Sequence, residues 1–419
     1  MESFMVGAAT SAHQVEGNNT HCDFWVMENL KHSDYAEPSG IACDHYNRYE
    51  EDICLLKDAG PNAYRFSIEW ARIEPLEGQF DPKEIEHYRN VLKTCRKYGV
   101  TPVVTLHHFS SPAWLIGKGG WKNKYVVDAF GKYTRYVVEN LKDELSYVCT
   151  INEANMGFQL QKVMKDMMNA SKREGDVQVG VKINMKNILL SMIEQGRAFH
   201  CNPLKINAFL RPRSQKDEEI VMQAHQKARS VIKSISKDIK VGLTLSLFDY
   251  QPVDGGEANV EKLWYEDFGF YLPFFRDDDF VGIQNYSRKL VSAAGIQDVP
   301  RKSAVTQMGY EDYPLSIGNV VRKAAKDFSG ELIITENGIA TDDDERRCEF
   351  IREAFESVMQ TKADGVKVGG YFCWSLLDNF EWQAGYSKTF GLIAVDRKTL
   401  QRYPKKSLSL LGELAAAEI

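Results

Sequence analysis

Eight short apolar segments recur along this chain, and helical patterns fill most of the stretches between them. The segments span residues 4–10, 62–68, 101–106, 147–151, 240–247, 280–283, 332–334 and 368–374. Short apolar runs bounded by turn residues are typical of strands that are buried on both faces. The alternation predicts an α/β protein with a parallel sheet, and eight repeats fit a closed (β/α)₈ barrel better than an open doubly wound sheet.

The helical patterns carry start and stop signals. Asp81 is a candidate N-cap, Pro82 fits the first helical position and Gly99 ends the pattern. Helices are expected to end near residue 60 and to span residues 82–98, 125–145, 185–197, 217–236, 343–362 and 405–417. No linker is visible, so we predict one domain over residues 1–419, a length that barrels with insertions reach.

Composition excludes several classes of partner. The formal net charge of -6 gives no electrostatic case for nucleic acid or an anionic membrane, and no apolar run is long enough to span a bilayer. Met1 leads into an apolar run without a basic segment, so we expect no signal peptide. The eight cysteines are scattered without a Cys-x-x-Cys pair, as in a reduced cytoplasmic protein. The sequence does not indicate an oligomeric state.

Polar and titratable side chains stand where the predicted strands end. They are Gln14, Arg65, His107, His108, Asn152, Glu153, Tyr286 and Glu336, and Trp374 ends the last strand. In a (β/α)₈ barrel the carboxyl ends of all strands lie on one face, where active sites are found. If these positions were only solvated loops, they would carry Lys, Ser and Asp more or less at random. The pattern therefore predicts an active site on this face.

Two of these residues, Glu153 and Glu336, are carboxylates that face the same predicted cavity. Such a pair can cleave a glycosidic bond if one carboxyl is protonated and the other ionised. Arg65 can hold a nearby carboxylate ionised, and Tyr286 can donate a hydrogen bond to it. Taken alone, Glu336 is also compatible with a solvated or helix-capping residue after a strand.

Motifs for other chemistries are missing from the sequence. No His, Asp or Glu grouping has a metal-ligand spacing, so we expect no metal. No Gly-x-Gly-x-x-Gly or Walker motif follows the first strand, and there is no Gly-x-Ser-x-Gly elbow. We therefore expect no nucleotide cofactor, and no cofactor of another kind is indicated.

The motifs together resemble glycoside hydrolase family 1, the retaining β-glycosidases. The matching segments are residues 7–17 (GAATSAHQVEG), 62–72 (NAYRFSIEWAR), 106–109 (LHHF), 150–153 (TINE), 279–287 (DFVGIQNYS), 333–338 (IITENG) and 371–396 (YFCWSLLDNFEWQAGYSKTFGLIAVD). They span nearly the whole chain in the order of the family. The resemblance implies a (β/α)₈ barrel that hydrolyses β-glycosides.

The resemblance also implies roles for individual residues. Glu153 falls on the acid/base of the family and Glu336 on its nucleophile, with Arg65 and Tyr286 on residues that support the nucleophile. The implied sugar-binding residues are Gln14, His108, Asn152, Trp374, Glu381 and Trp382. His107 is interpreted as structural.

Three departures from the family pattern stand out. Ala154 replaces the proline after the acid/base, which frees the backbone and predicts a less rigid aim for Glu153. Gln284 replaces an asparagine and has a longer side chain. Residues 156–214 show little family signature, and we expect them to form part of the leaving-group side of the cleft.

The loop after the last strand predicts a neutral sugar. Enzymes of the family that act on neutral sugars carry Glu-Trp there, as Glu381 and Trp382 do here, whereas those that act on phosphorylated sugars carry a Ser-Lys-Tyr set. Only Lys388 fits that set, and Phe390 stands in place of its tyrosine. Lys388 is expected to point to solvent or to pair with an acidic neighbour.

The expected substrate is a small carbohydrate or an aryl or alkyl β-glycoside, and the expected activity is that of a β-glucosidase. Galactoside and fucoside activity stay open, as does the natural leaving group. Two alternatives remain: a transglycosidase that uses the same glycosyl-enzyme intermediate, and a silent sugar-binding relative, against which the presence of both Glu153 and Glu336 argues.

Overall fold

The computed structural model describes residues 4–168 and 188–418. Nine strand segments form one parallel sheet in the order β5-β4-β3-β2-β1-β12-β11-β8-β6. These segments are β1 (Met5–Ala9), β2 (Ala63–Ser67), β3 (Thr101–His107), β4 (Tyr147–Ile151), β5 (Lys240–Gly242), β6 (Thr244–Ser246), β8 (Phe280–Gln284), β11 (Glu331–Asn337) and β12 (Val368–Trp374).

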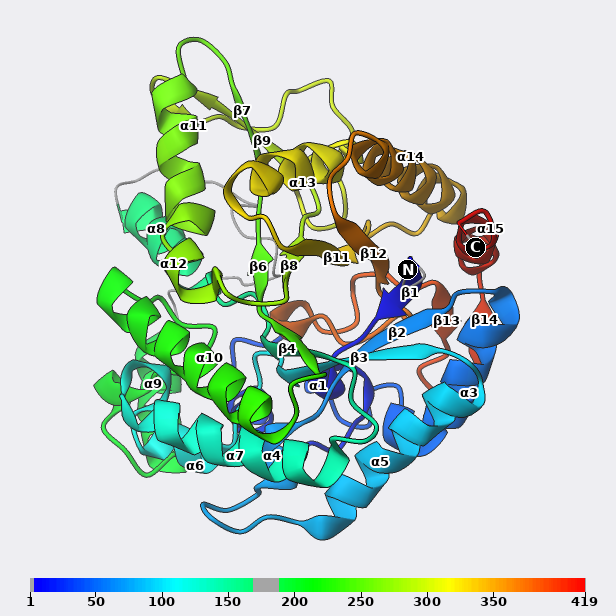
Figure 1. Cartoon of the computed structure of the whole chain (residues 1–419). Coiled ribbons are helices and arrows are strands. Elements are labelled where there is room, and N and C mark those ends of the chain that lie inside the picture. Colours follow the sequence, from blue (N-terminus) through cyan, green and yellow to red (C-terminus); the bar gives the residue numbers. More distant parts are fainter. Residues whose placement is uncertain (1–3, 169–187, 419) are drawn as a thin grey trace.

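The segments β5 and β6 are two halves of one strand, interrupted only at Leu243. The first half pairs with β4 and the second with β8. The ladder continues through Leu243, since its carbonyl accepts the Gly282 N–H at 2.8 Å. The two edges of the sheet therefore meet in one strand, and the sheet closes into the predicted (β/α)₈ barrel (Figure 1).

Helices surround the barrel in Figure 1. They include α3 (His45–Ala59), α5 (Pro82–Lys97), α7 (Tyr125–Leu141), α10 (Gln215–Ile235), α13 (Ser316–Asp327), α14 (Asp344–Ala363) and α15 (Lys406–Ala416). Asp81 caps α5 as predicted, because its side chain accepts the Lys83 N–H. Helix α10 begins two residues earlier than predicted, because Ser214 and Asp217 form a capping box.

Further helices connect these elements. They are α1 (Ala12–Val15), α2 (Asp23–Glu28), α4 (Trp70–Ile73), α6 (Ala113–Gly117), α8 (Met156–Met168), α9 (Ile188–Ala198), α11 (Glu257–Trp264) and α12 (Leu272–Phe275), with the single turns η1 (Gly120–Lys122), η2 (Pro203–Lys205), η3 (Tyr265–Gly269) and η4 (Trp382–Ala384). Helix α9 accounts for residues 188–197 of the predicted helix 185–197, and residues 185–187 lie outside the described residues.

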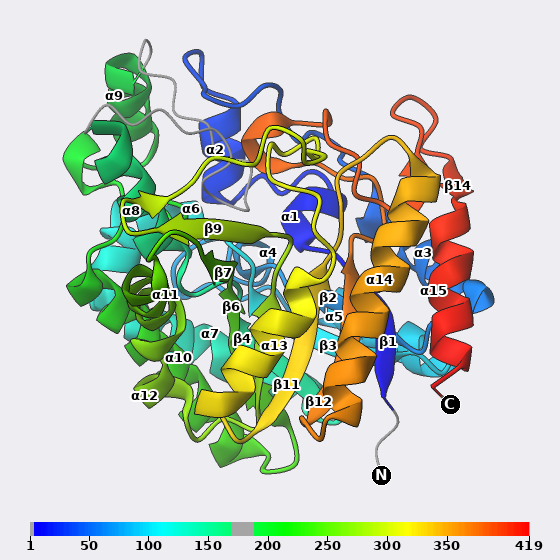
Figure 2. The ribbon, with the colours of Figure 1, turned by 90° about the horizontal axis from the view of Figure 1, so that it is seen from above.

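Two small sheets complete the architecture. The first contains β7 (Asp249–Pro252), β9 (Arg288–Ser292) and β10 (Gly295–Ile296), and the second pairs β13 (Ile393–Val395) with β14 (Arg402–Pro404). Figure 2 shows α1, α2 and β9 at the end of the barrel away from the N-terminus. The chain after the carboxyl ends of the barrel strands thus builds a rim over one face of the barrel.

Apolar residues pack on both sides of the barrel wall. The larger cluster lies between the strands and the outer helices. A smaller cluster includes Met5, Ala63, Val103, Ile333 and Phe372, all of them from barrel strands. Because side chains alternate along a strand, Arg65 points to the same side of β2 as Ala63, two residues before it. The register thus carries the guanidinium to the side of this smaller cluster.

The prediction of one domain over residues 1–419 stays a prediction. The pairing of β1 with β12 supports it, since it joins the first and last strands of the barrel. Among the described residues, no helix is long and apolar enough to cross a membrane.

Candidate active site

Glu336 lies at the end of β11 and is buried. Its Oε1 accepts hydrogen bonds from Arg65 Nη1 at 2.6 Å and from Gln284 Nε2 at 3.0 Å, and its Oε2 accepts one from the Tyr286 hydroxyl at 2.7 Å. Burial raises the pKa of Glu336, whereas Arg65 and Tyr286 oppose that rise. The donors around both oxygens favour the ionised carboxylate, as a nucleophile requires.

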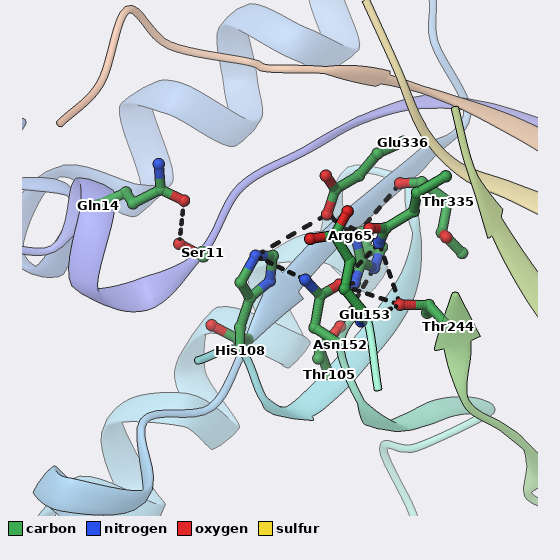
Figure 3. Close-up of polar contacts among 12 residues, drawn as sticks. Ser11, Gln14, Arg65, Thr105, His108, Asn152, Glu153, Thr244, Thr335 and Glu336 are labelled. Carbon is green, nitrogen blue, oxygen red and sulfur yellow. Dashed lines mark hydrogen bonds and ion pairs between the residues drawn. The ribbon is translucent and has the colours of Figure 1, made fainter. Parts of the chain in front are cut away.

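Arg65 is fixed from several sides. Its Nε donates to Thr105 Oγ1 at 3.1 Å, its Nη2 to Asn152 Oδ1 at 2.6 Å, and its Nη1 also reaches the Thr335 carbonyl at 3.2 Å. Figure 3 shows the guanidinium among these partners and Glu336. A buried guanidinium with its donors satisfied in this way holds its carboxylate partner in one place.

Glu153 follows β4 and has a different environment. Its side chain is buried, and Oε2 has no hydrogen-bond partner in the part of the chain that the structure describes. Burial raises the pKa of Glu153 well above its usual value, and the negative charge of Glu336 raises it further. These conditions favour the protonated carboxyl, which can act as a general acid.

Both carboxylates line one pocket. The other residues of its wall are His108, Phe109, Tyr286, Trp374, Glu381, Trp382 and Phe390. The remaining predicted site residues stand behind this wall. Gln14 Nε2 donates to Glu381 Oε2 at 3.3 Å, and Asn152 Nδ2 lies 3.1 Å from His108 Nε2. The structure therefore brings all ten predicted site residues to one place.

Aromatic side chains form part of the pocket wall. The rings of Trp374 and His108 stack with centroids 5.7 Å apart, and Trp382 packs against Phe109. His108 Nε2 lies 3.9 Å from Glu336 Oε1, but burial lowers the pKa of His108 well below its usual value, so the imidazole is neutral. A neutral imidazole and an aromatic face suit an uncharged sugar ring.

Glu381 is a third buried carboxyl of the pocket. Burial and the charge of Glu336 raise its pKa to about 8, against the opposing effects of Gln14 and Lys388. The half-buried Lys388 is held by a contact that was not expected, since its Nζ donates at 2.7 Å to the Gln307 carbonyl, while its charge acts on the neighbouring Glu381.

The less rigid orientation that was expected for the Glu153 side chain does not fit the hydrogen bonds of the neighbouring backbone. The Ala154 N–H donates to the Thr244 carbonyl at 3.0 Å, a bond that proline could not form. The sequence reasoning missed Thr244 and Phe109, and it noted Gln284 only as a departure from the family pattern, without its contact with Glu336. The unusual Gln284 at a strand end was the available signal, but its contact with Glu336 depends on the barrel register.

Two other expectations concern the surroundings of the pocket. His107 is structural as interpreted, because it bonds Ser111 Oγ at 3.0 Å and packs against Trp121 and Phe209. Helix α8 lines a separate groove with α11 and β9. A role of residues 156–214 on the leaving-group side stays a prediction, and residues 169–187 lie outside the described residues.

The site as a whole defines a class of protein. Within residues 4–168 and 188–418, no group of three His, Cys, Asp or Glu side chains could hold a metal ion. At the carboxyl ends of the barrel strands, one carboxylate is surrounded by donors and the other lacks a partner for one oxygen. Two carboxyl groups with such unequal environments, one favouring the ionised form and one the protonated form, are typical of the active site of a glycosidase.

Comparisons with known proteins agree with this class. The model of the family described as "Glycosyl hydrolase family 1" matches residues 1–178 and 292–418, which contain Glu153, Glu336 and Glu381 but not Gln284 or Tyr286. A 1,4-β-D-glucan glucohydrolase of Thermotoga neapolitana is 30% identical over 97% of this chain and 96% of its own. A 6-phospho-β-galactosidase of Staphylococcus haemolyticus is 28% identical over 100% of this chain and 98% of its own.

Solved structures give the same result. The crystal structure of β-glycosidase BGL167 has a TM-score of 0.89 and 38% identity, and the match covers 99% of this chain and 96% of that one. A β-glucosidase from Thermotoga maritima in complex with glucoimidazole has a TM-score of 0.81 and 28% identity, with 100% and 98% covered. The chain belongs to glycosyl hydrolase family 1, and it is a retaining β-glycosidase.

Proposed function

We propose that this protein removes terminal neutral β-D-glycosyl residues as a β-glucosidase-type enzyme, with Glu336 as nucleophile and Glu153 as acid/base. The observation that carries the proposal is the inequality of the two carboxyls. Arg65 and Tyr286 donate to Glu336, whereas Glu153 has an unpartnered oxygen and a raised pKa.

In the first step a carboxylate oxygen of Glu336 bonds to the anomeric carbon, and the bond from that carbon to the leaving oxygen breaks. Glu153 gives its proton to the leaving oxygen, so the alcohol departs uncharged. The Glu336 carboxylate becomes an ester and loses its charge. Because that charge helps to raise the pKa of Glu153, the pKa falls at this stage.

The second step uses the changed Glu153. Its carboxylate takes a proton from water, the water oxygen attacks the anomeric carbon, and the Glu336 carboxylate leaves. Two displacements at the same carbon return the sugar in the β configuration. Proton NMR of the first product should therefore detect the β anomer first, and an α anomer appearing first would contradict these roles.

The pocket favours a neutral sugar over a phosphorylated one. A phosphate dianion would add negative charge to a buried pocket in which the charge of Glu336 already acts on Glu381, and Lys388 donates to the Gln307 carbonyl. Sequence identity does not decide the question, because the T. neapolitana glucohydrolase and the S. haemolyticus phosphogalactosidase are 30% and 28% identical to this chain.

The discriminating experiment compares kcat/KM for 4-nitrophenyl β-glucoside and its 6-phosphate. The proposal predicts turnover of the glucoside and little turnover of the phosphate. A preference for the phosphate would overturn the assignment of Glu381 as a contact of the neutral sugar. Galactoside, fucoside and xyloside in the same panel define the sugar preference, and an added alcohol acceptor separates hydrolysis from glycosyl transfer through the products.

We also propose that the protein works in a reducing compartment such as the cytoplasm. All eight cysteines are free, and five of them are buried. Buried thiols without disulfide partners are typical of proteins that fold under reducing conditions. Purification with and without reductant tests this, since the proposal predicts full activity with reductant present.

A further inference from the structure

Thr244 lies in β6, where it bonds the backbone of Glu153 and the side chain of Gln284, which in turn bonds Glu336. We propose that Thr244 is a positioning residue that fixes the backbone of Glu153 and links it to Glu336. This inference rests on the proposed roles of the two glutamates. Figure 3 shows Thr244 in a hydrogen bond beside Asn152 and Glu153, on the side of the site formed by β6.

The backbone of Glu153 needs such support. Its φ is 42°, in the left-handed region that residues other than glycine rarely adopt. The Glu153 N–H donates to Thr244 Oγ1 at 2.9 Å, and the next N–H, that of Ala154, donates to the Thr244 carbonyl at 3.0 Å. One residue thus holds two successive amides on either side of the strained position.

The hydroxyl of Thr244 has its hydrogen-bonding capacity filled. A threonine hydroxyl can donate one hydrogen bond and accept two. Here it accepts from the Glu153 N–H and from Gln284 Nε2 at 3.1 Å, and it donates to Asn152 Oδ1 at 3.1 Å. Every bond of the hydroxyl is therefore made to Glu153 or to a residue packed behind the pocket wall.

Gln284 extends the contact to the nucleophile. Its Nε2, which has two hydrogens, lies within hydrogen-bond distance of three acceptors: Asn152 Oδ1 at 2.7 Å, Glu336 Oε1 at 3.0 Å and Thr244 Oγ1 at 3.1 Å. Without the Thr244 hydroxyl, Gln284 Nε2 would keep Asn152 and Glu336 as acceptors, so the bond to the nucleophile would remain while the Glu153 N–H would lose its acceptor.

The alanine at position 154 is part of the same arrangement. A proline there would lack the N–H that bonds the Thr244 carbonyl. The Ala154 carbonyl also accepts a hydrogen bond from Arg213 Nη2 at 3.3 Å, and the buried Arg213 is itself paired with Glu218 at 2.9 Å. Two of the expected departures from the family pattern, Ala154 and Gln284, therefore both bond to Thr244.

The test compares Thr244→Val, which keeps the branched shape but has no hydroxyl, with Thr244→Ser, which keeps the hydroxyl. The full-length variants are assayed on phenyl and 2,4-dinitrophenyl β-glucoside. For Thr244→Val, kcat/KM on the phenyl glucoside, which reports the first displacement, should fall about 10- to 100-fold, the scale of a misplaced catalytic group, because that leaving group needs the acid. On the dinitrophenyl substrate kcat/KM should fall less than about 3-fold, and Thr244→Ser should stay within about 3-fold on both.

Glu153→Ala is measured in parallel to separate the two hypotheses. If Glu153→Ala discriminates between the leaving groups but Thr244→Val does not, the positioning role of Thr244 is wrong. Equal losses on both substrates for Thr244→Val would indicate a structural role only and overturn the inference as well. If Glu153→Ala itself shows no discrimination, the proposed function fails instead. Should Thr244→Val not fold, Thr244→Ala removes the same hydroxyl with less bulk and is judged by the same outcomes.

Discussion

Replacing Tyr286 by phenylalanine removes a single hydrogen bond from the proposed nucleophile. The Tyr286 hydroxyl donates to Glu336 Oε2 at 2.7 Å, while Arg65 and Gln284 donate to the other oxygen. The ring stays in place, so the variant should leave the shape of the pocket nearly unchanged. The bond to Tyr286 lowers the pKa of Glu336, and its loss should raise that pKa.

The size of the effect follows from the charge of the acceptor. A hydrogen bond to a charged group contributes about 1.5–3 kcal/mol, and about 1.36 kcal/mol corresponds to one pH unit. Activity requires ionised Glu336 and is lost as the pH falls through the lower apparent pKa of the glutamate pair. The acidic limb of the kcat/KM profile should therefore move to higher pH by about one to two units.

The assay is the pH dependence of kcat/KM for an aryl β-glucoside, with Tyr310→Phe as the matched control. The Tyr310 ring lies 6.3 Å from that of Tyr286, and its buried hydroxyl has no hydrogen-bond partner among the described residues. The control should keep the wild-type acidic limb. An unmoved limb in Tyr286→Phe, or an equal movement in both variants, would refute the reasoning.

Other substitutions test other parts of the account. Glu153→Ala should lower turnover of poor leaving groups by 10²-fold or more, by about the contribution of a general acid, and azide should restore deglycosylation of activated substrates; equal losses without azide rescue would contradict the acid/base role. Glu381→Gln should lower activity on glucoside and galactoside more than on xyloside, which lacks the 6-hydroxyl, and equal losses on all three would mean that Glu381 does not contact that position. Arg402→Met should lower the free energy of unfolding by about 3–5 kcal/mol in chemical denaturation, because it leaves the buried Asp52 carboxylate without the guanidinium that bonds both its oxygens. A loss below about 1 kcal/mol would argue against this ion pair as a stabilising element.

The barrel strands could be predicted from the sequence because they are buried on both faces. The segment predicted over residues 62–68 is β2 (Ala63–Ser67), and the one over 368–374 is β12. Helix α13 was missed, since Ser316, Gly318 and Asn319 in its first turns have low helix propensity. The interruption at Leu243 was not visible either, because a strand that pairs with different neighbours along its length looks continuous in sequence.

The candidate site was predictable in its residue types and less so in its contacts. The position of Glu336 after a buried strand, with Arg65 at the end of another, indicated which side chains share a face. The contact of Gln284 with Glu336 joins residues 52 positions apart and depends on the register between β8 and β11. The bond from the Ala154 N–H to Thr244 depends on backbone direction, which no residue type specifies.

The most direct test of the central claim is covalent trapping of the nucleophile. Incubation with 2,4-dinitrophenyl 2-deoxy-2-fluoro-β-glucoside should inactivate the enzyme in proportion to the dinitrophenol released, since fluorine slows both displacements whereas the good leaving group speeds only the first. Peptide mass spectrometry should then place the fluorosugar on Glu336 and on no other carboxylate. A label on another residue, or inactivation without a label, would contradict the assignment of Glu336 as the nucleophile.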